Sequence, residues 1–189
     1  MTDTVPEDLV AVAVPQLLRS RLAYEGFVRV WLDEVRLPSG REAKREVVEH
    51  PGAVGILALT EAGEVLLVRQ WRHAAGRALL EIPAGTREAG ESVAATARRE
   101  LIEEVGFEPG ALTDLLTFFP SPGYSSEQIT LVRADGCRPV DHVPDPDEGT
   151  MLVTVPRGEI GRLIAWPNGP IQDGKTLVAL LTLLAAERP

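Results

Sequence analysis

The stretch "RRELIEEVGF", residues 98–107, decides the fold because it closes the central helix of the chain. Ser92 can cap the start of this helix, and "VAATARREL" contains strong helix formers and neither Pro nor Gly. Gly106 stands where a left-handed C-terminal cap belongs. We therefore expect a helix from Ser92 to Val105.

The charges of this helix oppose its own dipole. Glu100, Glu103 and Glu104 fall in its last two turns, where each anion is disfavoured by roughly 0.3–1 kcal/mol. At about 100° per residue, Glu103 and Glu104 lie within about 60° of Glu100, so three like charges share one side. Charge runs are usually solvated faces, which is the plain alternative. If the three carboxylates have a function there, a positively charged partner must offset their repulsion.

Composition limits the classes of protein to consider. A chain of 189 residues with 44% hydrophobic content can bury one good core, so a single domain is the natural expectation. There are 28 acidic and 19 basic residues, a net charge of −9, and no basic run stands out. We therefore expect no nucleic-acid partner, although local arginines or bound cations allow an anionic substrate.

The cellular setting follows from the cysteine count and the N-terminal stretch. Cys137 is the only cysteine, so an intrachain disulfide is impossible and a reducing compartment is expected. The opening residues 1–18, "MTDTVPEDLVAVAVPQLL", fit neither a secretory signal nor a membrane span. We expect a cytoplasmic protein without a membrane partner.

Strands outnumber helices along the chain. Residues 1–20 are expected to form a short helix or an arm. The expected strands are 24–37 and 41–50 as one hairpin, 53–60 and 64–72 as a second, then 78–85, 112–120, 128–136 and 150–156. Residues 121–127 and 142–149 are expected loops, and 157–166 and 173–189 expected helices, with Asp173 as a cap. This order indicates an α/β sandwich with a mixed sheet.

Residues 85–107, "GTREAGESVAATARRELIEEVGF", resemble the Nudix box: a glycine, five residues, Glu, seven residues, then Arg-Glu-apolar-x-Glu-Glu-x-Gly-apolar. The matching residues are Gly85, Glu91, Arg99, Glu100, Leu101, Glu103, Glu104, Gly106 and Phe107. The resemblance implies the Nudix fold, an α/β/α sandwich with a mixed central β-sheet.

The same resemblance implies a cation for the helix carboxylates. Nudix hydrolases bind Mg²⁺ or Mn²⁺ there, and such hard cations prefer oxygen ligands. Glu100 and Glu104 are then the expected direct ligands, and Glu103 is a ligand or activates water. The backbone carbonyl of Ala84 is expected to join them. Arg99 is expected to hold the carboxylates through ion pairs.

Two stretches outside the box resemble the ADP-ribose pyrophosphatase subgroup: "LLEIPAG" and "SPGYSSE", which places Pro122 fifteen residues beyond Phe107. The similarity covers most of residues 24–186. It implies hydrolysis of ADP-ribose to AMP and ribose 5-phosphate by water. Other Nudix substrates remain open (NADH, UDP-glucose, GDP-mannose), as does a non-catalytic ADP-ribose-binding regulator.

Further roles follow from the subgroup. Glu127 is the first candidate for the base that accepts the proton of water, and Glu103 competes with it. Arg72, Arg45 and Glu81 are expected substrate contacts, beside Pro122 in its loop. The ordinary alternatives are a loop carboxylate for Glu127 and surface ion pairs for the arginines.

The resemblance also implies a homodimer. We expect residues 1–50 to form an arm and β-hairpin that exchanges between two subunits, and residues 51–189 to form the hydrolase domain. Phe27, Val28, Val30 and Leu32 supply apolar side chains for such an exchange. Arg45 would then reach a site across the dimer interface.

Overall fold

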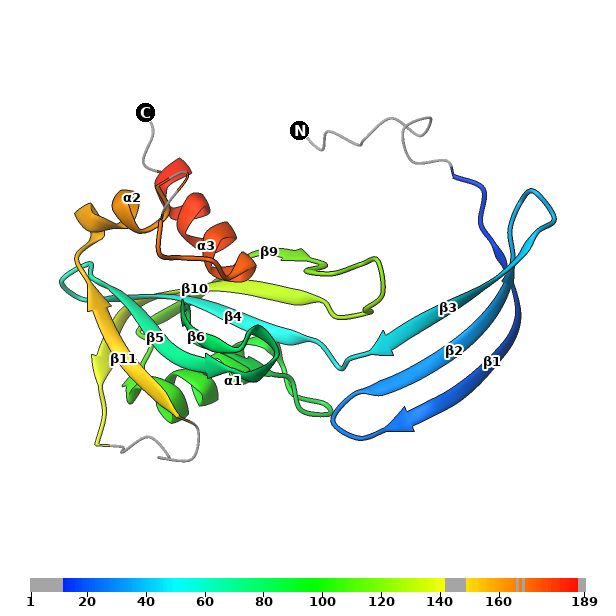
Figure 1. The fold of residues 1–189 in the computed structure, drawn as a ribbon. Helices are drawn as coiled ribbons and strands as arrows, with labels where there is room; N and C mark the ends of the chain where they lie inside the picture. The colour runs from blue at the N-terminus through cyan, green and yellow to red at the C-terminus, as the bar shows by residue number, and fades with distance from the viewer. Residues whose placement is uncertain (1–11, 142–148, 166, 168, 187–189) are drawn as a thin grey trace, which may run out of the picture. The chain divides into compact units, whose positions relative to one another are not determined.

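The structure is a computed structural model that describes residues 12–141, 149–165, 167 and 169–186. Its chain forms two compact units. Unit 1 contains the described part of Met1–His50 together with Ser121–Ser126, and unit 2 contains the described parts of Pro51–Pro120 and Glu127–Pro189. Each unit has its own β-sheet (Figure 1).

Unit 1 is a sheet of three antiparallel strands in the order β1-β2-β3. The strands are β1 (Gln16–Glu25), β2 (Arg29–Arg36) and β3 (Glu42–Glu49). The predicted hairpin is confirmed for β2 and β3, with Arg29 opposite Glu49 and Arg36 opposite Glu42, whereas residues 24–28 of its first predicted strand form the end of β1 and the turn to β2. Residues 16–20, expected in a helix or an arm, instead belong to β1, which satisfies its backbone groups along β2. Among the described residues of unit 1, Val35 alone is buried.

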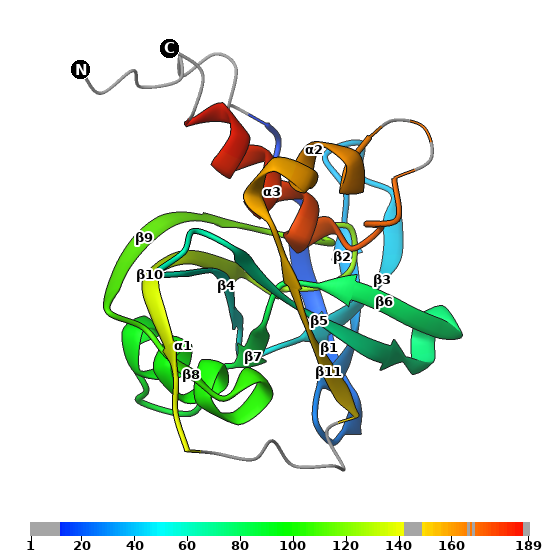
Figure 2. The same ribbon diagram turned by 90° about the vertical axis from the view of Figure 1, so that its left-hand side faces the viewer.

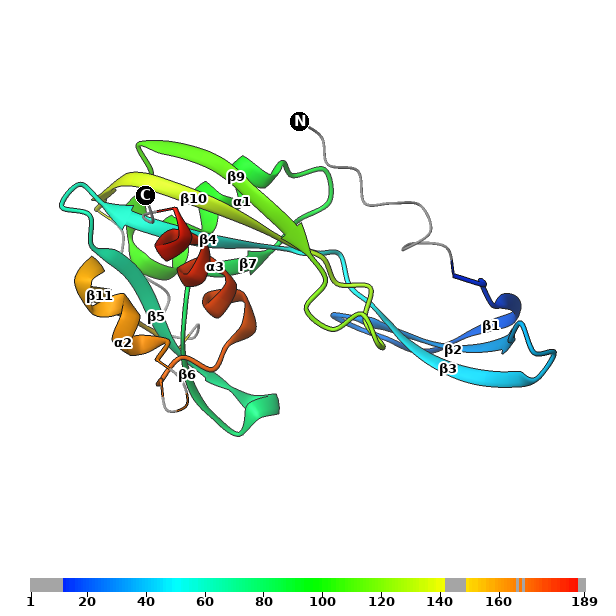
Figure 3. The ribbon, with the colours of Figure 1, turned by 90° about the horizontal axis from the view of Figure 1, so that it is seen from above.

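Unit 2 holds a mixed sheet, as predicted. Its strands are β4 (Ala53–Thr60), β5 (Val65–Arg72), β6 (Arg77–Glu81), β7 (Ala84–Thr86), β8 (Phe107–Glu108), β9 (Ala111–Phe118), β10 (Ile129–Pro139) and β11 (Thr150–Val155). The order is β11-β5-β4-β10-β8, with β6 beside β5, β7 beside β4 and β9 beside β10. β4 and β10 are parallel, and the other neighbouring strands in this order are antiparallel. Figure 3 shows β9 along β10 from above.

Helices cover both faces of this sheet, which confirms the expected α/β/α sandwich. The helices are α1 (Val93–Glu100), α2 (Ile160–Leu163) and α3 (Gly174–Ala185), with short 3₁₀ turns at His73–Ala75 and Arg157–Glu159. Figure 2 shows α2 and α3 on one side of the strands and α1 on the other. The apolar side chains form two clusters, one with Ala97 and Leu101 of the α1 segment and one with Leu180 and Leu183 of α3. β4 and residues 65–68 of β5 are continuous apolar runs because both of their faces are covered.

The central helix begins and ends where the sequence predicts. The Ser92 side chain accepts a hydrogen bond from the Ala95 amide at 3.2 Å, and Gly106 closes the helix with φ 70°. Between them, however, the helix changes form: Leu101–Val105 is π-helical, and the Gly106 amide bonds to the carbonyls of both Ile102 and Leu101. The α-helical angles assumed for Glu103 and Glu104 are therefore wrong beyond Glu100, and such π segments are frequent at functional sites.

The remaining elements are close to expectation. Residues 78–85 form parts of two strands, β6 and β7, because Ile82 and Pro83 interrupt the ladder. β8 was not expected, since two residues carry no periodic signal. The expected loop 142–149 lies almost wholly outside the described residues. Over the described parts of the chain, no helix is long and apolar enough to cross a membrane.

Candidate active site

The acidic end of the helix lies against the short strand β7. Glu104 Oε2 accepts a hydrogen bond from the Ala84 amide at 3.0 Å. Glu100 is packed so closely on Gly85 that any side chain at position 85 would overlap its carboxylate. Only 9% of Glu100 and 7% of Glu104 are exposed. Two largely buried carboxylates thus meet the backbone of Ala84 and Gly85.

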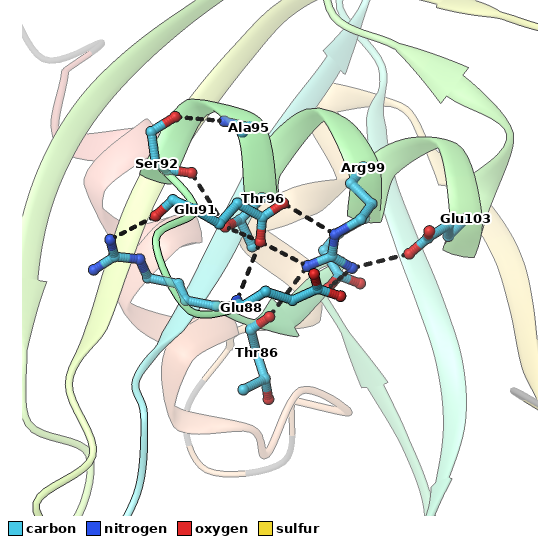
Figure 4. A network of polar contacts seen from close by, with 10 residues as sticks. Thr86, Glu88, Glu91, Ser92, Ala95, Thr96, Arg99 and Glu103 are labelled. Carbon is cyan, nitrogen blue, oxygen red and sulfur yellow. Dashed lines mark hydrogen bonds and ion pairs between the residues drawn. The ribbon is translucent and has the colours of Figure 1, made fainter.

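Arg99 organises the glutamates around it (Figure 4). Its Nη1 lies 2.7 Å from Glu100 Oε1 and 3.0 Å from Glu103 Oε2. Its Nε and Nη2 each lie 3.1 Å from a Glu91 oxygen, and Nη2 also donates to the Thr86 carbonyl at 3.1 Å. One guanidinium therefore ties three carboxylates to β7. We call Glu91, Arg99, Glu100, Glu103 and Glu104 the box cluster.

The ionisation of Glu91 reflects this network. The Arg99 hydrogen bonds, aided by the Thr96 hydroxyl and the Glu88 amide, lower the pKa of Glu91 from 4.5 to about 2. In return, the bonds to Glu91, and the neighbouring Glu103 and Glu100, raise the pKa of Arg99 despite its partial burial. Glu91 and Arg99 therefore stay charged across the physiological range.

The box cluster has more negative than positive charge. Glu91, Glu100, Glu103 and Glu104 are its acids, and Arg99 is its base. The Glu100 carboxylate bonds to Arg99 and the Glu104 carboxylate to the Ala84 amide. Among the described side chains, no group of three acidic, His or Cys residues is therefore arranged to coordinate a metal ion. The donors nevertheless fit a hard divalent cation, since they offer oxygens alone and carry excess negative charge. Glu100, Glu104 and the Ala84 carbonyl would hold it, with the partly exposed Glu103 beside them.

A second charged group lies on β5, β6 and the start of α3. Glu81 is 1% exposed, and Arg72 donates from Nε and Nη2 to its two oxygens at 2.7 Å each. Lys175 Nζ also contacts Glu81, and lies 3.1 Å from Asp173 Oδ2. We call Arg72, Glu81, Asp173 and Lys175 the Glu81 cluster.

Electrostatics connect the two clusters. Burial raises the pKa of Glu81, but the bonds and charges of Arg72 and Lys175 outweigh it and the pKa falls below its usual value. The bond to Glu81 raises the pKa of Arg72 against the effect of burial, and the charges of Asp173 and Glu104 raise it further. The charge of Glu104 is thus part of the electrostatic environment of Arg72.

The other predicted site residues belong to neither the box cluster nor the Glu81 cluster. Glu127 precedes Gln128, whose carbonyl accepts from the Ala53 amide at 2.9 Å, and Ala53 pairs with Thr86. This register places Glu127 at the end of the sheet where β4 begins and β7 ends. Arg45 and Pro122 belong to unit 1, so their part in the site stays a prediction.

Sequence reasoning missed Lys175 and Thr176. The Thr176 hydroxyl accepts a hydrogen bond from the Ile82 amide at 2.9 Å. The "DGKT" stretch that holds both residues was interpreted as a helix start within the subgroup resemblance, with no role for either residue. Its partners lie 94 residues away along the chain, and no spacing rule connects them.

Comparison with known proteins agrees with this fold. A model of the NUDIX domain matches residues 49–171, so the chain belongs to the NUDIX domain family. The match contains the box cluster and the whole of β4 to β11.

Three similar proteins give the family its context. An ADP-ribose pyrophosphatase of Bacillus subtilis (strain 168) is 35% identical over 162 residues, 85% of this chain and 86% of the relative. A methanol dehydrogenase activator of Bacillus methanolicus is 37% identical over 162 residues, with the same coverage. A solved structure of an ADP compounds hydrolase superposes with a TM-score of 0.80 at 23% identity, covering 93% of this chain and 95% of that chain, and this likeness concerns the fold.

Proposed function

We propose that this protein hydrolyses the diphosphate bond of ADP-ribose to AMP and ribose 5-phosphate with the help of a divalent cation. The observation that carries the proposal is the box cluster, in which two buried glutamates converge on Ala84 and Gly85 with excess negative charge. The similarity to the ADP-ribose pyrophosphatase of Bacillus subtilis supports the choice of substrate.

The residues divide the work as follows. Glu100, Glu104 and the Ala84 carbonyl hold Mg²⁺ or Mn²⁺, with Glu103 as a further ligand. Such a cation, when bound, neutralises phosphate oxygens and lowers the pKa of water. Arg99 keeps the carboxylates in place through its bonds to Glu100 and Glu103.

Arg72 binds a phosphate of the substrate. Its side chain is 40% exposed, and its planar fork of donors suits phosphate oxygens. Among the described residues, the Nη1 group of Arg72 makes no hydrogen bond, so it remains available to a ligand. Arg45 and Pro122 complete the substrate contacts in this proposal.

A glutamate accepts the proton of the attacking water. Glu127 remains the first candidate, because a loop position lets it join the site once substrate is bound. Glu103 is the competitor. It already contacts Arg99 in the box cluster, and its side chain is 42% exposed.

We also propose that the enzyme is a cytoplasmic homodimer in which residues 1–50 form the dimerisation region and residues 51–189 the hydrolase domain. A sheet with one buried residue, Val35, has little core of its own. Leu17, Tyr24 and Phe27 are each more than half exposed, which supports a second subunit covering them. The single cysteine supports a reducing compartment.

The test is a substrate panel. Purified protein is incubated with Mg²⁺ and ADP-ribose, NADH, UDP-glucose or GDP-mannose, and the products are identified by mass. We expect AMP and ribose 5-phosphate, with the highest kcat/KM for ADP-ribose. Faster cleavage of another compound would keep the hydrolase and replace its substrate.

A regulator is the second candidate, because one relative is named as an activator of another enzyme. A protein that binds ADP-ribose in calorimetry, yet cleaves no member of the panel with Mg²⁺ or Mn²⁺, would favour it.

A further inference from the structure

We propose that Lys175 and Thr176, at the start of α3, are positioning residues for the reaction: Lys175 sets Arg72 through Glu81, and Thr176 sets the strand that carries Ala84. The proposal rests on the proposed function, since it takes Arg72 as the phosphate-binding residue and Ala84 as a metal ligand.

The first link runs from α3 to Arg72. Glu81 is buried at 1% exposure, and Lys175 is 10% exposed at the side chain, so their ion pair is shielded from water. The remaining anchor of Lys175 is Asp173, the residue that caps α3 by accepting from the Thr176 amide at 2.9 Å. Lys175 is therefore held by two carboxylates, those of Asp173 and Glu81, and it holds the Glu81 carboxylate in place in turn.

Glu81 transmits this placement to the guanidinium. The two bonds at 2.7 Å are made by Nε and Nη2 of Arg72, so one edge of the guanidinium plane is fixed. The opposite edge, with Nη1, then faces a direction that Glu81 determines. Val68 lies opposite Glu81 in the pairing of β5 with β6, and side chains two residues apart on a strand share a face. Gln70 and Arg72 therefore lie on the same face of the sheet as Val68. This is the face of the sheet on which Val68 packs with Leu101 of the box helix.

The second link runs from α3 to Ala84. Thr176 is 0% exposed, its hydroxyl accepts from the Ile82 amide at 2.9 Å and donates to Asp173 Oδ2 at 2.5 Å. Ile82 is two residues before Ala84, and the Pro83 carbonyl between them accepts from the Ile56 amide of β4 at 2.8 Å. The segment that presents the Ala84 carbonyl is thus held by α3 on one side and by the sheet on the other.

Charge balance explains why these groups hold a ligand-binding arginine in place. The Glu81 cluster contains two acids, Glu81 and Asp173, and two bases, Arg72 and Lys175. Without Lys175, the buried Glu81 has Arg72 as its single cation, and the arginine is drawn toward the carboxylate and away from a phosphate. Lys175 therefore leaves Arg72 free to share its charge with the substrate.

The test is a double-mutant cycle of Lys175→Met and Arg72→Met, assayed with ADP-ribose and Mg²⁺. Lys175→Met alone should raise KM about tenfold with a smaller change in kcat, because ligand binding is lost in the ground state and transition state alike. In the Arg72→Met background the same change should have little further effect on KM, since groups that act through one another are not additive. Arg162→Met is the matched control, because it removes an exposed cation from a pair with Glu159 at 3.0 Å and should change neither constant.

The outcomes separate the two claims. Additive effects of Lys175→Met and Arg72→Met, or a lower kcat with unchanged KM, would overturn the positioning role while the hydrolase stands. A wild-type protein that binds ADP-ribose without cleaving it would refute the proposed function alone, and the cycle is then read from Kd. Should Lys175→Met fail to fold, Asp173→Asn keeps a capping acceptor and removes the charge beside Lys175. It should raise KM by a smaller factor, and again only when Arg72 is present.

Discussion

Unit 2 contains the Glu81 cluster and the box cluster, and the charge of their buried carboxylates is balanced in different ways. The Glu81 cluster has as many bases as acids, and its most buried carboxylate is held by two cations at once. The box cluster has four glutamates and one arginine. A balanced cluster is complete as it stands and serves to hold side chains in place. An unbalanced one gains stability from an added cation, which is the property expected of a metal site.

The largest effect should come from the metal-facing side of the box cluster. Glu104→Gln removes one charge while keeping the shape, and should lower kcat with Mg²⁺ by about 10²-fold or more, a loss of several kcal/mol in transition-state stabilisation. The thermal midpoint without metal should be unchanged or higher, because one repulsive charge is gone. Glu64→Gln, at the half-buried end of the turn between β4 and β5 and outside both clusters, is the control. Near-normal turnover of Glu104→Gln would refute the metal assignment.

The base is tested by a pair of changes. Glu127→Gln should lower kcat by roughly 10²-fold, the range of general base catalysis, while ADP-ribose and Mg²⁺ still bind. Binding is measured by calorimetry and kcat by AMP release. Unchanged rates in Glu127→Gln, together with a large loss in Glu103→Gln, would move the proton-accepting role to the box cluster.

The balanced cluster should respond in stability. Glu81→Gln leaves two cations beside a buried neutral amide, and breaking a buried pair costs about 3 kcal/mol. The free energy of unfolding in urea measures this loss. The exposed pair of Arg162 and Glu159 gives the contrast, since Arg162→Met should change stability by less than about 0.5 kcal/mol. Equal effects of the two changes would remove the distinction between structural and surface charge pairs.

Metal should stabilise the wild type through the box cluster. At a free Mg²⁺ concentration 100 times Kd, the expected gain in unfolding free energy is about 2.7 kcal/mol. Thermal unfolding with and without Mg²⁺ measures it, and EDTA should abolish both the gain and the activity. Glu104→Gln should show little gain, whereas Glu81→Gln, outside the metal donors, should keep it.

The smallest effect concerns acid stability. The pKa of Glu91 falls from 4.5 to about 2 on folding, chiefly because of Arg99. A depressed folded pKa stabilises the protein fully above about pH 4.5 and loses that contribution as the pH falls toward 2. The difference in unfolding free energy between wild type and Glu91→Gln should therefore shrink over that window. A constant difference from pH 7 to pH 2 would show that Glu91 acts through shape and not charge.

The sequence predicted the local features well and the distant contacts poorly. Ser92 and Gly106 carry their own capping chemistry, so both ends of the helix were correct. The π-helical turn from Leu101 was not predictable, because it depends on packing and not on residue type. The bonds of Glu81 to Arg72 and Lys175 were not predicted, because nothing nearby in the chain indicates them, and its role as a substrate contact stays a prediction.

Some predictions came from the family pattern alone, because local sequence does not show which distant residues meet. The composition of "RRELIEEVGF" indicates an acidic helix end, and the Nudix spacing predicts a metal site there. Nothing in the "DGKT" stretch indicates its partner, since Lys175 reaches Glu81 only after the C-terminal helix packs on the sheet. Non-local charge pairs of this kind become visible when the fold is known.

The π-helical end of the central helix limits how the protein can change in length over evolution. A π turn takes up one more residue than an α turn. Deleting a single residue from Leu101–Val105 would restore α geometry and rotate Glu104 relative to Glu100 by about 100°. Insertions and deletions should therefore be absent from this segment in active homologues. They should be tolerated in turns such as that at Gly76, where φ is 65° and no atom lies within 4 Å of the position that a Cβ atom would take.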